Sequence, residues 1–179
     1  SAITNKSLED IETVAKCEKK LDDMQEALTE FLIKVDNLSL SESQKKHINN
    51  LFNMVTDIER VGDHADNLSE NAKYMIDNDL EFSDLGKEDL AEISKDSIEA
   101  FEIALNARSG GALRAVRKVN KLEDEVDMLE DEMREKHIER LSKGDCNPQA
   151  GIAFLDIISN LERISDHATN IAGYVKNEI

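Results

Sequence analysis

The sequence predicts an all-α protein with the architecture of an elongated antiparallel up-down bundle. Its 179 residues include one proline, seven glycines and no tryptophan, while 34% of them are charged. Few helix-breaking residues and many charged ones are typical of long helices rather than sheets. Apolar residues also recur every three or four positions, the period of an amphipathic helix. Finally, one motif occurs twice about a hundred residues apart, which indicates a duplicated helical unit.

The first predicted helix covers residues 7–35, and "DNLSLSESQ" at residues 36–44 interrupts it. Its apolar stripe consists of Val14, Cys17, Leu21, Met24, Leu28, Phe31 and Val35. Within the interruption, Ser41 and Gln44 have the spacing of a capping box. They therefore predict the start of the second helix, which continues to about residue 78.

The third helix is predicted to begin after a cap at Ser83 or Asp84, and "SGG" at residues 109–111 predicts a turn after it. The fourth helix runs to about residue 141, with Gly144 as its C-terminal cap. Asn147 and Pro148 supply the N-cap and the first position of the fifth helix. Short connections make neighbouring helices antiparallel, so their stripes should bury one another within the chain. An intermolecular coiled coil remains the alternative.

The repeated motif reads "DIERVGDHADN" at residues 57–67 and "NLERISDHATN" at residues 160–170. Upstream of each, "VAKCEKKLD" at residues 14–22 aligns with "VNKLEDEVD" at residues 119–127. The first two helices thus correspond to the last two. We predict two repeats of a three-helix unit, residues 1–80 and 81–179, of which the first lacks its first helix. The chain is accordingly expected to be a piece of a longer protein.

Four Glu-x-x-x-Asp pairs occupy equivalent places in this duplicated frame. In every pair the glutamate takes heptad position e and the aspartate the following b, so both flank the apolar seam. The eight candidate metal ligands are Glu18, Asp22, Glu59, Asp63, Glu123, Asp127, Glu162 and Asp166. Carboxylates that converge from packed helices need a counter-ion, and oxygen ligands suit iron, manganese, magnesium or calcium, with zinc also open. The alternative is an acidic face that only keeps the chain in solution.

Other residues of the repeated motif are candidates for secondary roles. Asn67 and Asn170, one turn beyond each aspartate, could add amide oxygens to a metal site. His64 and His167 could be outer ligands, or they could be hydrogen-bonded residues without a metal. The last repeated pair is Arg60 and Arg163. Each arginine could form a salt bridge with its acidic neighbours or contact an anion beside a metal cluster.

Composition narrows the function. The formal net charge of −17 argues against direct binding to nucleic acid or anionic lipid, because both need a basic surface. No nucleophilic triad, Gly-rich phosphate loop or Glu-x-x-His motif is present, so we predict no enzyme and no catalytic residues. A metal-free acidic scaffold that binds a basic partner remains open. The two cysteines favour a reduced protein, although a disulfide between them stays open.

The acidic motifs resemble those of the PhoU family. "DIERVGDHADN" and "NLERISDHATN" look like that family's Glu/Asp-x-x-x-Asp motif on the third helix of each repeat, and "EKKLD" and "EDEVD" look like its counterpart on the second helix. The resemblance implies two three-helix bundles side by side, with multinuclear iron or zinc clusters on the carboxylate motifs. It also implies negative regulation of phosphate uptake and signalling, through contacts with a phosphate transporter and a sensor kinase.

Five predicted helices instead of six make the chain look most like the PhoU-like tail of a bacterial sodium/phosphate cotransporter. That resemblance implies a membrane transport domain in the same polypeptide and a cytoplasmic location at the inner face of the cell membrane. The alternative is a stand-alone PhoU-type regulator of phosphate signalling. A homodimer is also open.

Overall fold

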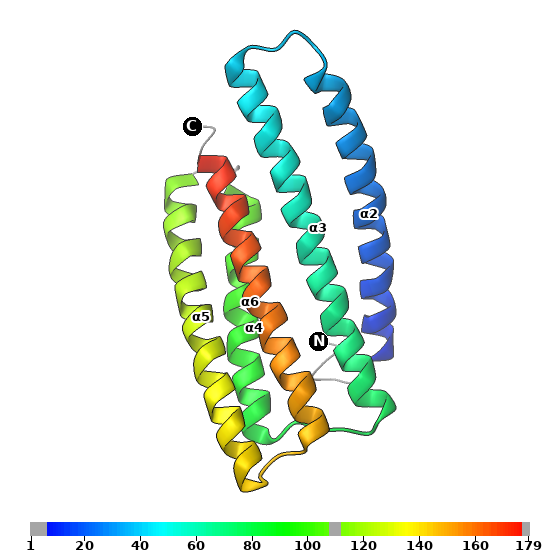
Figure 1. Ribbon diagram of the computed structural model, residues 1–179, viewed down its shortest axis with the longest axis vertical. Coiled ribbons are helices and arrows are strands. Elements are labelled where there is room, and N and C mark those ends of the chain that lie inside the picture. Colours follow the sequence, from blue (N-terminus) through cyan, green and yellow to red (C-terminus); the bar gives the residue numbers. More distant parts are fainter. Residues whose placement is uncertain (1–6, 108–111, 177–179) are drawn as a thin grey trace.

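The computed structural model describes residues 7–107 and 112–176, and these ranges contain five helices and no strand. The helices are α2 (Leu8–Asp36), α3 (Glu42–Asp77), α4 (Asp84–Asn106), α5 (Ala112–Lys143) and α6 (Pro148–Lys176). Figure 1 shows that helices adjacent in sequence run antiparallel in an elongated bundle. The predicted all-α architecture is therefore confirmed. In the two described ranges, no helix is both long enough and apolar enough to cross a membrane.

Side-chain caps start the helices where the sequence predicts them. Ser7 and Ser83 accept hydrogen bonds from backbone N–H groups of the first turns of α2 and α4. Ser41 and Gln44 form a complete capping box at the start of α3. Asn147 Oδ1 accepts two backbone N–H groups of the first turn of α6. Each cap satisfies donors that have no partner inside the helix, so it fixes where the helix begins.

Left-handed residues end two of the helices. Gly144 has a φ of 77° just beyond α5, as expected for a glycine C-cap. Asp79 has a φ of 51° just beyond α3, and a short polar side chain tolerates this conformation. The turn predicted at residues 109–111 lies outside the described residues.

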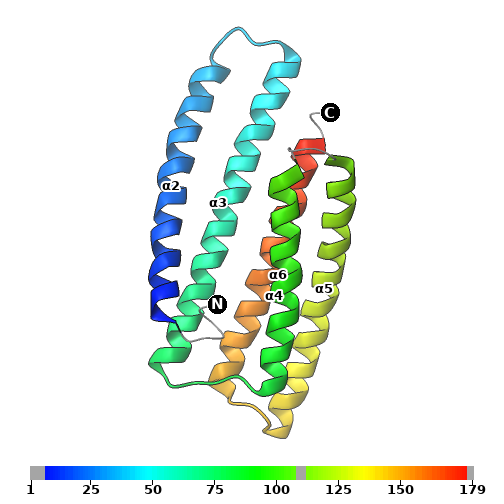
Figure 2. The same cartoon turned by 180° about the vertical axis from the view of Figure 1, so that it is seen from behind.

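α3 and α6 form the centre of the bundle. α2 packs against α3, α3 packs against α6, and α4 and α5 pack against α6 and against each other. Figure 2 shows the pair α2–α3 on one side of the bundle and α4–α6 on the other. Val61 of α3 belongs to the same buried cluster as Ile157, Leu161 and Val126. Because this core crosses the predicted boundary between residues 80 and 81, the two repeats share one hydrophobic interior, and that boundary stays a prediction.

The prediction that the stripe of the first helix is buried within the chain is wrong for part of α2. Met24, Leu28 and Phe31 are 59%, 44% and 60% exposed. The reason is the number of neighbours: α5, the counterpart of α2, packs against both α4 and α6, whereas the extensive contacts of α2 in the described chain are with α3. A single neighbour covers only one side of the stripe.

Gly151 should be essential for the packing of α6 against α5. A Cβ atom at Gly151 would lie 2.5 Å from Nε2 and 2.9 Å from Cε1 of His137. His137 is 4% exposed and stacks on Phe154, so its ring cannot move away cheaply. We expect Gly151→Ala to lower the free energy of unfolding by about 1–3 kcal/mol in urea titrations.

Gly173→Ala in the same helix is the matched control, because a Cβ atom there meets nothing within 4 Å. It should raise the free energy of unfolding by up to about 1 kcal/mol, since alanine is the better helix former. Equal effects of the two substitutions would contradict the packing argument.

Candidate metal centre

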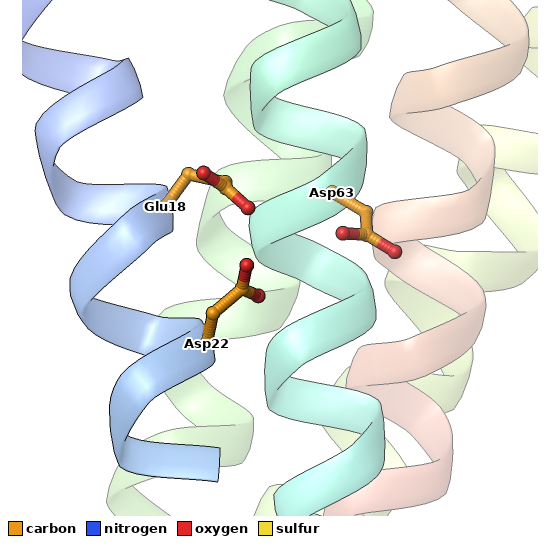
Figure 3. A group of neighbouring side chains, drawn as sticks. All are labelled: Glu18, Asp22 and Asp63. Carbon is orange, nitrogen blue, oxygen red and sulfur yellow. The ribbon is translucent and has the colours of Figure 1, made fainter. Parts of the chain in front are cut away.

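The first acidic cluster joins α2 to α3. Glu18 and Asp22 project from successive turns of α2 toward α3, which carries Asp63 (Figure 3). One carboxylate oxygen of each of these three residues lies within 4.8 Å of the other two. Gly62 allows the close approach, because a Cβ atom there would be 2.8 Å from Cδ1 of Leu21. The helix pair thus brings three like charges into one small volume.

The second acidic cluster repeats this arrangement between α5 and α6. Glu123 and Asp127 of α5 meet Asp166 of α6, again with one carboxylate oxygen from each residue within 4.8 Å of the other two. The same repeat positions contribute in both halves, and in both the aspartate of the first helix is the most exposed member. Two separate helix pairs therefore build the same constellation, which a random scatter of acidic residues would not do.

Glu59 and Glu162 do not belong to these groups, so the structure gathers six of the eight predicted carboxylates. They border the clusters instead. Burial raises the pKa of Glu59, and the charge of Asp63 adds to the effect. Burial, followed by the charge of Asp166, raises the pKa of Glu162 to about 7. Each is thus a neighbouring carboxylate whose pKa is raised by the charge of a cluster aspartate, although it is not a member of the cluster.

Three of the clustered carboxylates, Glu18, Glu123 and Asp127, have raised pKa values. A hydrogen bond with Asp22 is the largest cause for Glu18, which means that the two groups favour sharing a proton. For Glu123 and Asp127 the largest cause is burial, and the neighbouring carboxylates come next. The raised pKa values of these three groups mean that their ionised forms are less favourable in the fold than in water, and a nearby positive charge would offset this.

One arginine accompanies each cluster. Arg60 Nη1 lies 3.7 Å from Oδ2 of Asp63, and Arg163 Nη1 lies 3.5 Å from Oδ2 of Asp166. Arg163 also reaches Glu162 at 3.4 Å. Both arginines are exposed and belong to the same helices as their partners. They form the salt bridges considered from the sequence, and each offsets one of the three negative charges of its cluster.

The two predicted histidines lie between α3 and α6 rather than with the clustered carboxylates. His64 Nδ1 is 2.9 Å from Oδ1 of Asn160, and His167 Nδ1 is 2.6 Å from Oδ1 of Asp57. The two rings are 5.5 Å apart between centroids. Neither histidine belongs to the acidic groups found in the described ranges. Both connect the central helices instead.

The two predicted asparagines take part in the same contact. Asn67 donates its amide N–H to Asn160 at 3.2 Å, and Asn170 donates to Asp57 at 3.5 Å. Asp57 also hydrogen-bonds Tyr174, and burial together with this bond raises the pKa of Tyr174 to about 12. Both asparagines, like the histidines, thus face a polar network between the repeats.

The comparisons with known proteins agree with this geometry. A family model described as the PhoU domain matches residues 1–72 and again residues 90–175, which together are most of the chain. The chain belongs to the PhoU family. The two matches correspond to the two halves that carry the acidic clusters.

Two curated relatives of this PhoU-family chain are named as accessory proteins of phosphate-specific transport systems. PhoU homolog 1 of Thermotoga maritima is 23% identical over 128 residues, which cover 72% of this chain and 54% of that protein. The PhoU homolog of Clostridium acetobutylicum is 26% identical over 168 residues, which cover 89% of this chain and 73% of that protein. The chain therefore spans about half the length of the Thermotoga relative and about three quarters of the Clostridium one.

Two solved PhoU structures share the fold. The crystal structure of PhoU from Pseudomonas aeruginosa superimposes with a TM-score of 0.84 at 20% identity, covering 94% of this chain and 80% of that one. The phosphate transport system regulatory protein PhoU from Streptococcus pneumoniae gives the same score and identity, covering 99% and 82%. At this identity the likeness establishes the PhoU architecture, not a shared partner or ligand.

Sequence reasoning missed Asp57 and Asn160, although a signal for them exists. They are the first residues of the two copies of the repeated motif, and each precedes a histidine of its own helix by seven positions. Residues seven apart share a helix face. The antiparallel crossing of α3 and α6 then pairs each of these residues with the histidine of the other copy.

A second polar group consists of His137 and Arg140, and it could not be found from the repeat. The corresponding residues of the first repeat, 105 positions earlier, are the apolar Leu32 and Val35. His137 stacks on Phe154, and burial, followed by the charge of Arg140, lowers its pKa. Arg140 Nη1 donates to Asp89 at 2.9 Å. This ion pair ties α5 to α4 at the end of the bundle away from the acidic clusters.

The stability of the metal-free PhoU domain should fall as the pH rises from about 4.5 to about 7. The folded protein retains the proton of Glu162 to about pH 7, whereas the ordinary pKa is 4.5, so ionisation in this window disfavours the folded state. Glu162→Gln removes this contribution and should be more stable than the wild type at pH 8 by up to about 3 kcal/mol. Urea unfolding in chelator at several pH values measures the difference.

Glu139→Gln on α5 is the control, because Lys143 lowers the pKa of Glu139. It should leave the loss of stability between pH 4.5 and 7 unchanged. If Glu162→Gln and the wild type followed the same pH profile, the environment assigned to Glu162 would be wrong.

Proposed function

We propose that this chain is a non-enzymatic PhoU-type regulatory domain that restrains phosphate uptake and binds metal cations at its two acidic clusters. Family membership supports the regulatory role, because both curated relatives are named as accessory proteins of phosphate transport systems. The observation that carries the metal proposal is the repeated constellation of Glu18, Asp22 and Asp63 in one half and its counterpart in the other.

The residues of each cluster fit a hard cation. Three carboxylates within 4.8 Å of one another supply an all-oxygen donor set. The pKa of Glu18 is raised first by its hydrogen bond with Asp22, and the charges of Asp22 and Asp63 add to the effect, so a bound cation would favour its ionised form. Oxygen ligands suit iron, manganese, magnesium and calcium, whereas zinc sites usually include nitrogen or sulfur. Of the iron and zinc that the family resemblance implies, the donor set favours iron. The exposed aspartates, Asp22 and Asp127, leave open coordination positions.

Metal binding would affect both the shape and the charge of the domain. Each cluster takes ligands from two helices, so a bound cation clamps α2 to α3 or α5 to α6. It also replaces a locally repelling anionic patch with one that a phosphate group or an acidic partner surface can approach. Regulation then follows if the transporter or a sensor kinase recognises the metal-loaded surface more tightly than the metal-free one.

The transporter that this domain regulates is proposed to be a separate polypeptide. Both named relatives are accessory proteins, and this supports a stand-alone regulator over a tail joined to a sodium/phosphate cotransporter. In either setting the domain acts on the cytoplasmic face of the membrane. The coding sequence upstream of Ser1 distinguishes the two, because membrane-spanning segments in the same reading frame would restore the cotransporter proposal.

Metal titration tests the clusters directly. The chain is stripped with chelator and titrated by calorimetry with Fe²⁺ without oxygen, and with Mn²⁺ and Zn²⁺. We expect two binding sites for each chain, one at each acidic cluster. Asp63→Asn should weaken binding at the first cluster, and Asp63→Asn with Asp166→Asn should weaken binding at both clusters, in each case by at least about tenfold. Loss of a residue that supports a ligand costs about tenfold or more in metal affinity, and loss of a ligand itself should cost at least as much.

Glu88→Gln with Glu92→Gln is the matched control for the charge that these substitutions remove. Glu88 and Glu92 are four residues apart on the exposed face of α4, as are the two acids of each Glu-x-x-x-Asp pair. Unlike those pairs, they have no counterpart in the other repeat. This double variant should bind metal like the wild type. Equal weakening in both double variants would identify a general effect of acidic charge and would favour the metal-free scaffold.

The regulatory role has a separate test in cells. Replacing Asp63 and Asp166 by asparagine should raise phosphate uptake in phosphate-rich medium, while the variant at Glu88 and Glu92 keeps uptake low. Normal uptake in cells that lack the gene would contradict the regulatory role, even if the purified domain binds metal.

A further inference from the structure

A small pocket lies at the end of the bundle where α4 and α6 begin and α5 ends (Figure 2). Its cavity measures about 10 Å³ and is partly open to solvent, so it has room for roughly one water-sized group. The pocket is separate from the acidic clusters, because its residues on α5 follow Asp127 by ten positions or more, about 15 Å of helix. The residues that line it include Gly86 of α4, His137 and Arg140 of α5, and Gly151 and Phe154 of α6.

Arg140 is held in this pocket with one edge of its guanidinium group unpaired. Nη1 donates to Oδ2 of Asp89 at 2.9 Å, and Cζ lies 5.5 Å from the centre of the Phe154 ring. Nε and Nη2, in contrast, are buried and have no acceptor within hydrogen-bonding distance among the described residues. These two atoms form the edge that binds a carboxylate through two parallel hydrogen bonds.

Arg134, six residues earlier on α5, shows the same edge with its partner in place. Its Nε lies 3.4 Å from Oε2 of Glu130, and its Nη2 donates to Oε1 of the same carboxylate. Glu130 precedes Arg134 by four positions, whereas the residue four positions before Arg140 is Lys136. α5 therefore supplies a carboxylate to the edge of Arg134 but none to the edge of Arg140.

The rest of the pocket also favours an anion. His137 is 4% exposed, and its buried Nε2 has no hydrogen-bond partner within residues 7–107 and 112–176. The first turns of α4 and α6 line the pocket through Gly86 and Gly151, and the N-terminus of a long helix carries a partial positive charge. The acidic groups nearby include Glu81 and Asp89. Glu81 is exposed, so solvent screens its charge, and Asp89 is already paired.

We propose that this pocket binds the carboxylate group of a small organic anion. The two oxygens accept hydrogen bonds from Nε and Nη2 of Arg140, and Nε2 of His137 is a further donor. A planar carboxylate suits the pocket because the ring of Phe154 places an apolar surface beside the guanidinium group. A phosphate ion has four oxygens, so it needs donors on several sides and more room than this cavity provides.

An NMR titration of the whole chain with sodium acetate tests the proposal. The protein is first stripped of metal, and the chelator is then removed because chelators carry carboxylates themselves. We expect the Nε–H signal of Arg140 and the backbone amide signals of Gly86 and Gly151 to shift saturably. The dissociation constant should be about 1 mM, a value suited to so small a ligand.

Sodium chloride at the same ionic strength separates binding from charge screening. It should leave these three signals nearly unchanged. Equal shifts with chloride, or no saturable shift with acetate, would overturn the proposal, and the unpaired donors would then be satisfied by water.

Arg140→Lys removes the two-donor edge but keeps a positive charge for Asp89. It should weaken acetate binding by at least about tenfold, measured on the two glycine amide signals, because hydrogen bonds between charged groups are lost. Arg134→Lys is the matched control, since the edge of Arg134 is already paired within its own helix. This control should bind acetate like the wild type. Equal acetate affinity in Arg140→Lys and the wild type would overturn the assignment of the site to Arg140.

Inorganic phosphate at the same ionic strength tests the chemistry of the ligand. It should bind more weakly than acetate, and equal or tighter binding would overturn the assignment to a carboxylate. If circular dichroism shows that Arg140→Lys loses the helical fold, the Nε–H signal of Arg140 in the wild type decides alone. A hydrogen bond to acetate moves that proton signal downfield, and a signal that stays in place would contradict the proposal.

Discussion

The antiparallel contact between α3 and α6 determines where both acidic clusters form. His64 with Asn160 and His167 with Asp57 fix the relative position of these helices in a dense hydrogen-bonded network. Asp63 and Asp166 directly precede the two histidines in sequence, so the network also sets the direction in which these carboxylates leave their helices. α2 and α5 then pack on the outer sides of the pair and supply the other carboxylates.

The network is polar because an apolar contact would not fix the register of two long helices. Buried hydrogen-bonding groups lose much of their energy when their partners are displaced, whereas aliphatic side chains can slide into new pairings at little cost. Asp57 is 8% exposed and accepts bonds from His167, Asn170 and Tyr174. A slip of one turn would leave this carboxylate buried without partners, and the acidic clusters would then be misaligned.

The sequence predicts local features well, because each depends on neighbouring residues: the caps at Ser41 and Asn147, the glycine stop at Gly144 and the acidic pairs within one helix. It also predicts that α2 and α5 bring acids to the same relative places.

The sequence does not predict which carboxylates converge. Glu59 and Glu162 occupy the same heptad position as Glu18 and Glu123, yet they are not members of the acidic clusters. Their positions depend on how far the helices are rotated in the packed bundle, which periodicity fixes only to within tens of degrees. His137 and Arg140 are unpredictable for a different reason, since their repeat counterparts are apolar.

The difference between the two halves has a physical consequence for metal binding. α5 is held on two sides, by α4 and α6, so Glu123 and Asp127 are presented by a helix whose position is fixed before any cation binds. α2 is held chiefly by α3, so Glu18 and Asp22 are carried by a helix with fewer restraints. If metal binds as proposed, a cation at the second cluster would meet a preorganised site, whereas one at the first cluster would also have to order α2. Preorganisation would then favour tighter binding at the second cluster than at the first.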